Sequence, residues 1–252
     1  MTLLETMLSS ANNWQSIVCD GCTHPYSHYA GGCSDIRGWD CEKCLNEIHF
    51  AESAYNHQDP NKILIRKDYD CSKLLHCYVQ RFADRYYKSI KYACKNIDFG
   101  IYPILNILSL GCGNAPDLAA LHELAAGKPL IYTGVDSNPC WSALQRNIEN
   151  YAQNLDNNLF VKFICGDALQ PSNLPQTEIY NVVVIQWLIS TILKGGGTPE
   201  NIYSLFNGIV ASAASRWREE HILDSPFLII LSDVDNFEFG NYILNSPHTL
   251  IT

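Results

Sequence analysis

The sequence contains no continuous apolar run that approaches the roughly 18 residues needed to cross a membrane as a helix. Its first residues, MTLLETMLSSANNW, have neither the basic start nor the apolar stretch of a secretory signal. These absences argue against a membrane-spanning segment and against export. We therefore expect a soluble, cytoplasmic chain that does not associate with a membrane.

Positive charge is also scarce, since 17 Lys and Arg face 26 Asp and Glu and give a formal net charge of −9. Residues 1–70 carry 5 basic and 10 acidic side chains, and residues 101–252 carry 6 and 14. Only residues 71–100 are basic, with 6 against 2. This balance opposes a protein that coats nucleic acid, although a local basic patch stays possible.

Internal repeats and low-complexity segments are absent as well, which excludes repeat arrays and fibres. The 252 residues are 47% hydrophobic and 17% charged, as in a folded globular protein. That length has room for one large domain, or for a mid-sized domain with a small module.

Cysteine, by contrast, is abundant, and five of the 11 cysteines lie between residues 19 and 44. In a reducing compartment, such a cluster favours metal ligation over disulfides. Two Cys-x-x-Cys pairs are separated by 18 residues, a spacing typical of a closed, tetrahedral, structural zinc site. The four predicted ligands are Cys19, Cys22, Cys41 and Cys44.

The stretch around these cysteines shows neither helical nor strand periodicity, so we expect a small, loop-rich module that metal binding stabilises. Four further side chains could replace a member of the quartet or bind a second ion. These are Cys33, His24, His28 and His49. We assign residues 1–70 to an N-terminal zinc-binding module.

Apolar residues recur at spacings of three and four from residue 72 to residue 97, which predicts an amphipathic helix. Its other face carries lysine and arginine, including Arg81, Arg85 and Lys88. We expect residues 71–100 to form a connecting helix whose charged face is in solvent.

Beyond residue 100, buried-type strands alternate with helical patterns at short spacing. Apolar strand patterns stand at 104–110, 130–136, 159–167, 178–190 and 226–235, with helical patterns at 117–127, 140–155 and 200–221. This alternation predicts an α/β domain over 101–252, with a mostly parallel, doubly wound sheet and flanking helices. Few residues follow the last strand pattern, so the sheet could be abbreviated at the C-terminal end of the chain.

Three consecutive strand patterns end in features suited to a nucleotide-like ligand. The first ends in the glycine-rich LGCGNAP, the second in Asp136, which lies 23 residues beyond Gly113, and the third in Asp167. Glycines let the backbone turn tightly and approach a ligand, and an acid about 20 residues on can accept ribose hydroxyls. All three features would meet at the carboxyl edge of the sheet.

In these motifs the chain resembles the class I S-adenosylmethionine-dependent methyltransferases over roughly residues 104–235. The resemblance implies that Asp136 holds the ribose hydroxyls and that Asp167, with Ala168 beside it, lies at the adenine. It places Gln186 and Trp187 near the sulfonium and the acceptor. The turn facing the methionine part of the cofactor would be Leu110, Gly111, Cys112 and Gly113.

The chain departs from that family at Ser109, where many members have an acid, and at Ala115, where many have a third glycine. Asp117 could supply the missing carboxylate. The main competing reading is a dinucleotide-binding dehydrogenase, but Pro116 stands where the G-x-G-x-x-G motif needs a glycine.

The sequence does not identify a catalytic base. The candidates are His221, Asp233 and Asp235, which are more typical of surface or helix-capping residues. An Asp/Asn-Pro-Pro-aromatic motif is absent after the fourth strand pattern, which disfavours exocyclic base amines and glutamine amides as acceptors. We therefore predict a methyltransferase for a small-molecule or protein acceptor. Two alternatives remain: a non-catalytic binding protein that uses the zinc module, and an RNA N-methyltransferase.

Overall fold

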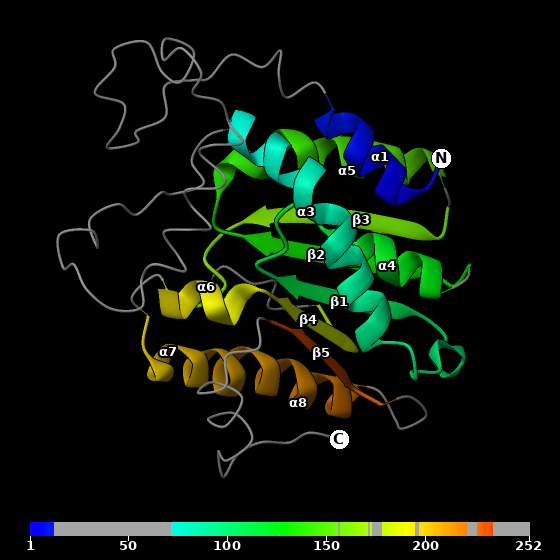
Figure 1. Ribbon diagram of the computed structural model, residues 1–252. Helices are drawn as coiled ribbons and strands as arrows, with labels where there is room; N and C mark the ends of the chain where they lie inside the picture. The colour runs from blue at the N-terminus through cyan, green and yellow to red at the C-terminus, as the bar shows by residue number, and fades with distance from the viewer. Residues whose placement is uncertain are drawn as a thin grey trace, which may run out of the picture.

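A five-stranded sheet, parallel throughout, forms the centre of the molecule, with strands in the order β3-β2-β1-β4-β5 (Figure 1). The strands are β1 Leu105–Leu110, β2 Leu130–Asp136, β3 Leu159–Cys165, β4 Val182–Gln186 and β5 Leu228–Ser232. The computed structural model describes residues 1–12, 72–125, 127–155, 157–170, 172, 178–194, 197–220 and 226–233. Within these residues, the sheet confirms the predicted Rossmann-like α/β fold.

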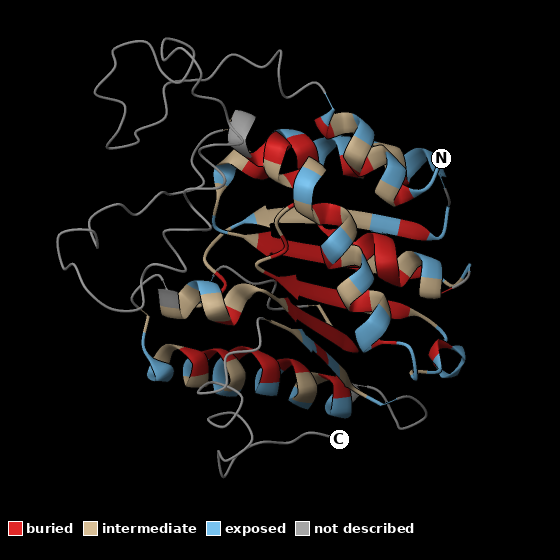
Figure 2. Cartoon of the chain, viewed as in Figure 1, coloured by how far each residue is buried: buried red, intermediate tan, exposed pale blue. Residues whose placement is uncertain are grey.

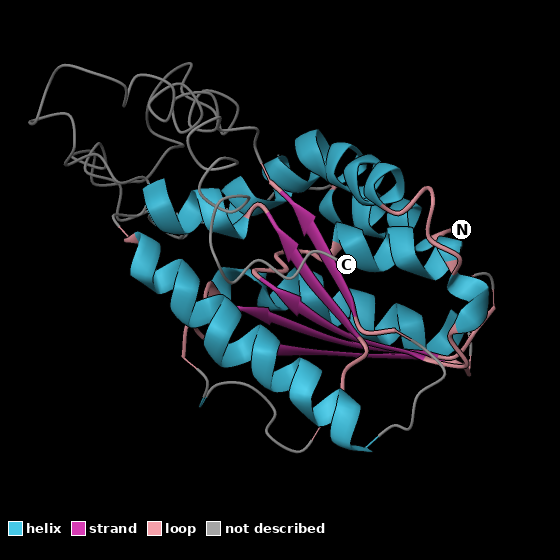
Figure 3. Ribbon diagram, turned by 90° about the horizontal axis from the view of Figure 1, so that it is seen from below, coloured by secondary structure: helices cyan, strands magenta, loops and turns pink. Residues whose placement is uncertain are grey.

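Helices cover both faces of this sheet, as Figure 3 shows from below. One face carries α1 Leu3–Ala11, α3 Ser72–Ala93, α4 Pro116–Leu124 and α5 Ser142–Leu155. The other carries α6 Leu188–Lys194, α7 Pro199–Ser204, the π-helical turn η7 Leu205–Val210 and α8 Ala211–Glu220. Two short 3-10 turns, η4 Phe99–Ile101 and η5 Pro139–Trp141, precede β1 and α5.

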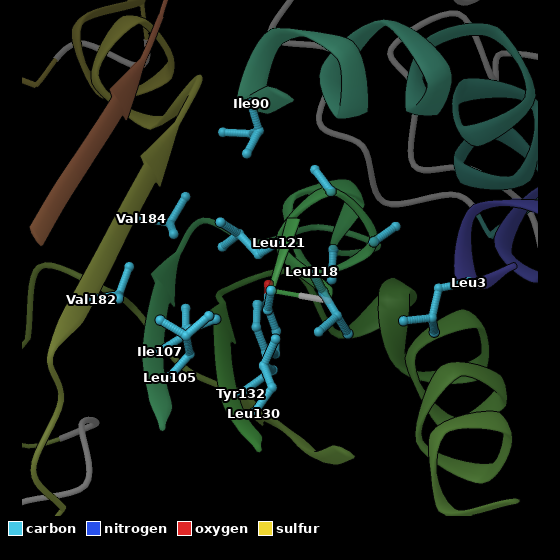
Figure 4. Packing of buried hydrophobic residues seen from close by; sticks show 14 of the residues in the cluster. Leu3, Ile90, Leu105, Ile107, Leu118, Leu121, Leu130, Tyr132, Val182 and Val184 are labelled. Atoms are coloured by element: carbon cyan, nitrogen blue, oxygen red, sulfur yellow. The ribbon is translucent and has the colours of Figure 1, made fainter. Parts of the chain in front are cut away.

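The central strands are buried on both sides because their apolar residues alternate between two cores. In β1, Leu105 and Ile107 pack with the α3 and α4 layer, whereas Leu108 and Leu110 pack with the α6 to α8 layer. Figure 2 shows β1 almost wholly in the buried colour, and Figure 4 shows the first of the two cores from close by. The prediction of strands buried on both faces is confirmed for β1, β2 and β4, whereas β3 and β5, at the two ends of the strand order, keep exposed apolar side chains such as Phe160 and Leu231.

The amphipathic helix predicted from residue 72 onward is α3, and its apolar residues join the cores. Leu75, Val79 and Ile90 are buried, while Arg81 and Arg85 are exposed. Because α3 packs on α4 and on α1, it is part of the α/β core (Figure 1).

The sequence analysis did not identify α1, although residues 2 to 5 contain its signal. The Thr2 side chain accepts a hydrogen bond from the Glu5 N–H at 3.2 Å, and the Glu5 carboxylate accepts one from the Thr2 N–H at 2.7 Å. This reciprocal pair is a capping box, which fixes a helix start. Leu3, Met7 and Ala11 then fall on one face and are buried.

Strand β4 is shorter than the predicted 178–190, because it ends at Gln186 and α6 begins at Leu188. Trp187 separates them with a left-handed backbone, φ 58°. No glycine, proline or aspartate interrupts the sequence from Val182 to Ile189, so nothing in it gave a sign of this turn.

The predicted zinc ligands lie outside the described residues, as do His221 and Asp235. Within the residues the structure describes, no group of three or more His, Cys, Asp or Glu side chains is arranged to hold a metal ion. Over the same residues, no helix is both long enough and apolar enough to cross a membrane.

Candidate cofactor site

The glycine-rich turn follows β1 and is fixed to the end of β2. The N–H groups of Gly111 and Cys112 both donate to the Val135 carbonyl oxygen, at 2.8 and 3.1 Å. Gly111 and Gly113 have φ values of +68° and +52°, a region in which residues with a Cβ are strained. Two glycines therefore allow the chain to turn sharply between β1 and α4.

The side chains of Leu110 and Cys112 anchor this turn from below. Both are buried, Leu110 in the α6 to α8 core and Cys112 in the α3 and α4 core. Gln145 of α5 adds a hydrogen bond from Nε2 to the Gly113 carbonyl oxygen at 2.7 Å. Only backbone atoms of Leu110 and Cys112 are therefore placed to contact a ligand.

Asp136, the last residue of β2, holds the turn and the loop after it with one carboxylate. Its Oδ2 accepts the Gly113 N–H at 2.8 Å, and its Oδ1 accepts the Asn138 N–H at 2.9 Å. Burial raises the pKa of Asp136 above its ordinary value, and these two hydrogen bonds oppose the rise. A carboxylate offers about four lone-pair positions, so about two stay open to hydroxyl donors.

Asp167 lies at the same edge of the sheet, as the sequence predicted from the ends of the strands. Asp136 pairs with Cys165 in the β2–β3 register, and the Gly166 N–H donates to the Asp136 carbonyl oxygen at 2.9 Å. Asp167 Oδ1 accepts the Leu169 N–H at 2.9 Å, which shapes the turn that contains the buried Ala168. Asp136 and Asp167 thus end neighbouring strands.

Asp117, in the first turn of α4, brings a buried carboxylate next to Ser109 of β1. Asp117 is only 1% exposed, and both of its oxygens accept the Tyr132 hydroxyl, at 3.0 and 3.1 Å. Ser109 also hydrogen-bonds to it. Ser109 and Asp117 contact each other in the interior, and this contact stabilises the glycine-rich turn between β1 and α4.

Burial raises the pKa of Asp117 to about 6, although hydrogen bonds from Ser109 and Tyr132 favour the ionised form. The folded protein thus keeps this proton up to about pH 6, whereas an unfolded aspartate releases it near pH 4. Between those values the folded state binds more protons, so its stability falls as pH rises. Ionised Asp117 is a net cost to the fold at neutral pH.

Replacing Asp117 by asparagine should remove that pH dependence. We expect the free energy of unfolding of Asp117→Asn, measured relative to that of wild type, to rise by about 2–3 kcal/mol as the pH goes from about 4 to about 7. Urea unfolding of both proteins across this range measures the difference, and contributions from all other carboxyls cancel. A difference that stays constant with pH contradicts the assigned pKa.

Gln186 and Trp187 end β4 beside the turn and contact α3. Gln186 Nε2 donates to the Tyr86 carbonyl oxygen at 2.9 Å, and the Trp187 and Tyr86 ring centroids are 5.1 Å apart. Leu188 lies 2.9 Å from the position that a Cβ on Gly111 would occupy. These two predicted residues therefore lie next to the glycine-rich turn.

Asn114 and Trp141 are site residues that the sequence analysis missed. Asn114 is 3% exposed, and its Nδ2 has no hydrogen-bond partner among the residues that the structure describes. The Trp141 ring lies 3.5 Å from the position of a Cβ on Gly113. The Asn-Pro pair after Asp136, which starts η5, was the available signal for the position of Trp141.

Asp233 is the one candidate base among the described residues. Its Oδ2 accepts the Ser190 N–H at 3.0 Å, in the first turn of α6. Asp233 therefore caps a helix, as its type and position suggested.

The hydrogen-bonding groups at this edge fit an adenosine-type cofactor with an amino-acid tail. Asp136 supplies an acceptor for hydroxyls, Asp167 a second carboxylate one strand away, and Asn114 a buried donor with no partner among the described residues. Gly111 and Gly113 carry no Cβ, and the side chains of Leu188 and Trp141 lie close against them. These groups converge at the carboxyl ends of β1, β2 and β3, where open α/β sheets bind ligands.

No family model matches the chain, and no curated protein matches it. Among solved structures, it is similar to CalS10, an amino pentose methyltransferase from Micromonospora echinaspora. That match has 18% identity and a TM-score of 0.34, and covers 60% of this chain and 49% of CalS10. DesVI from Streptomyces venezuelae matches at 16% identity and a TM-score of 0.40, over 63% of this chain and 54% of DesVI.

The plantazolicin methyltransferase BpumL, in complex with SAH, matches at 20% identity and a TM-score of 0.37, over 83% of this chain and 68% of BpumL. The chain thus spans about half the length of CalS10 and DesVI. At these identities and TM-scores, the similarities do not by themselves establish a shared activity.

Proposed function

We propose that the chain is an S-adenosylmethionine-dependent methyltransferase acting in the cytoplasm on a small-molecule or protein acceptor. The observation that carries this proposal is the Asp136 carboxylate, which joins the glycine-rich turn to the end of β2. It puts carboxylate oxygens that can accept hydroxyl groups directly beside the backbone of the glycine-rich turn. Nucleic acid is not favoured as the acceptor, because the chain carries a net charge of −9.

The residues of this chain would hold the cofactor in three parts. Asp136 would accept the ribose hydroxyls, Asp167 would accept the adenine amino group, and the turn at Gly111 and Gly113 would lie along the amino-acid tail. The partnerless Asn114 Nδ2 would donate to the carboxylate of that tail. The Asn114 assignment would satisfy a buried donor that has no hydrogen-bond partner among the residues the structure describes.

Bound S-adenosylmethionine would supply the methyl carbon. A lone pair of the acceptor would form a bond to this carbon while the electron pair of the carbon–sulfur bond returns to sulfur, and the acceptor would release a proton. Orientation of the two reactants supplies much of the rate in such a displacement. Trp187 and the rings of α3 lie where the acceptor would be oriented. An acceptor amine or thiolate needs no further base from the protein.

A dinucleotide cofactor fits this turn poorly. Pro116 is the first residue of α4 and lacks an N–H, and Ala115 before it has a left-handed backbone, φ +57°. The helix start therefore lacks one of the donors that would bind a pyrophosphate. The test is a calorimetric titration of the folded protein with S-adenosylhomocysteine and, separately, with NAD.

Saturable one-site binding of S-adenosylhomocysteine without binding of NAD is the expected result. Binding of NAD alone would replace the proposal with a dehydrogenase. If neither compound binds, the fold has lost its cofactor and the chain is a binding protein.

We also propose that a structural zinc ion is bound by Cys19, Cys22, Cys41 and Cys44, on the strength of their spacing. Elemental analysis of the purified protein should give about one zinc per chain. Replacing Cys19 and Cys44 together by serine should abolish it, whereas Cys165→Ser, at an exposed free cysteine, should not. Folded protein without zinc contradicts the proposal.

A further inference from the structure

Aromatic rings form a continuous row along one side of α3. Tyr78, Phe82 and Tyr86 recur at every fourth position, with 4.9 Å between the first two ring centroids and 5.9 Å between the stacked second and third. The row ends in a tryptophan on each side, Trp141 at 6.1 Å from Tyr78 and Trp187 at 5.1 Å from Tyr86. We refer to these five residues as the aromatic wall.

The aromatic wall borders the glycine-rich turn at both ends. Trp141 packs over Gly113, and the residue after Trp187, Leu188, packs over Gly111. The Gln186 hydrogen bond to the Tyr86 carbonyl fixes the α3 end of the wall to the carboxyl end of β4. A molecule bound against the wall would therefore lie next to a cofactor bound at the turn.

Trp187, at one end of the aromatic wall, has two features that are energetically unfavourable. Its left-handed backbone, φ 58°, is rare for a bulky residue, and such strain concentrates at functional sites. Its indole Nε1 is buried and has no hydrogen-bond partner within the described part of the chain, although buried tryptophans usually find one. This N–H is therefore available to an oxygen atom of a ligand.

The charges beside the wall indicate the sign of its ligand. The guanidinium carbon of Arg85 lies 5.6 Å from the Trp187 ring centroid, and that of Arg81 lies 5.7 Å from the Phe82 centroid. Two guanidinium groups therefore already lie over these rings. Their positive charge would repel an amine or ammonium ligand. Among the acids near the site, Asp136 and Asp233 accept backbone N–H groups, and Asp84 of α3 forms an ion pair with Lys88.

We propose that the methyl acceptor of this protein is a planar aromatic molecule with an anionic group. Its ring would stack on the aromatic wall, its anionic group would pair with Arg85, and the Trp187 N–H would donate to one of its oxygens. This inference rests on the proposed methyltransferase function, since it assigns the acceptor class of the same site. It excludes cationic amines, which an aromatic wall alone would favour.

The test uses the full chain saturated with S-adenosylhomocysteine and three small probes, one with both proposed features and two that each lack one of them. The probe 4-hydroxybenzoate has a planar ring and a carboxylate, tyramine has the ring with an ammonium, and cyclohexanecarboxylate has the anion without a planar ring. Quenching of tryptophan fluorescence and calorimetry measure binding. We expect 4-hydroxybenzoate to bind at least about tenfold more tightly than the other two.

Two variants connect that binding to the wall. Arg85→Ala should weaken 4-hydroxybenzoate at least about tenfold, and Trp187→Phe, which keeps a ring but loses the N–H, should weaken it severalfold. The matched control is Lys88→Ala, at an exposed residue of the same helix paired with Asp84, and should leave binding unchanged. Titration of each variant with S-adenosylhomocysteine shows whether its cofactor site is intact.

Failure of this inference and failure of the proposed function have different signatures. If S-adenosylhomocysteine does not bind the wild-type protein, the proposed function itself is wrong. If S-adenosylhomocysteine binds but 4-hydroxybenzoate does not, or tyramine binds equally well, only the acceptor class is overturned. Equal effects of Arg85→Ala and Lys88→Ala would also overturn it.

Discussion

Replacing Asp136 by alanine is expected to weaken S-adenosylhomocysteine binding by about 10- to 100-fold, the scale of losing hydrogen bonds to a charged acceptor. The substitution removes the predicted ribose contact. It also frees the Gly113 and Asn138 N–H groups, which both lose their acceptor. Calorimetric titration of wild type and variant measures the loss.

Asp98→Ala is the matched control for this prediction. Asp98 likewise uses its carboxylate to accept a backbone N–H, that of Gly100 at 2.7 Å, but it precedes β1 and lies at the other edge of the sheet. We expect its variant to bind S-adenosylhomocysteine as wild type does. Wild-type affinity in Asp136→Ala, or an equal loss in Asp98→Ala, contradicts the assigned site.

Gly134→Ala should destabilise the fold by about 1–3 kcal/mol, the usual cost of overpacking a core. A Cβ at position 134 would lie 2.7 Å from both Cys112 Sγ and a ring carbon of Phe163. Cys112 is buried in the glycine-rich turn, so the clash would also displace the turn. Chemical denaturation measures the stability, and S-adenosylhomocysteine affinity should fall with it.

Gly208→Ala separates overpacking from the general effect of adding a methyl group. A Cβ at Gly208 would meet no atom within 4 Å, so the change should be neutral or slightly stabilising. Adding Cys112→Ala to Gly134→Ala should recover part of the lost stability, since it removes the clashing sulfur. If Gly134→Ala is as stable as wild type, the close packing beneath the turn is wrong.

The α/β domain was predictable because its signals are local and periodic. The strands β1, β2 and β3 end in aspartate or are followed at once by glycine, and the order of the motifs brings Gly113, Asp136 and Asp167 to one edge whatever the details of packing. The carboxylate of Asp117 was only a guess from the sequence. Its contact with Ser109 depends on how α4 sits on β1 and β2, which no local pattern encodes.

The aromatic wall could not be predicted from the sequence. Tyr78, Phe82 and Tyr86 recur at every fourth position and so fall on one helix face, but this spacing does not distinguish a ligand-binding row from a row packed in the core. Trp187 and Trp141 join that face only through the tertiary fold, from residues about 60 to 100 positions away in the chain. The left-handed turn at Trp187 follows from tertiary packing and runs against the preference of the residue itself.

The central claim is that a cofactor binds at the glycine-rich turn and the ends of β2 and β4. Hydrogen exchange of backbone N–H groups, with and without saturating S-adenosylhomocysteine, tests it most directly. We predict slower exchange in residues 110–115, 136–138 and 186–188, with no change at η4 on the opposite edge of the sheet. Slowed exchange confined to other segments, or no change at all, would contradict the account.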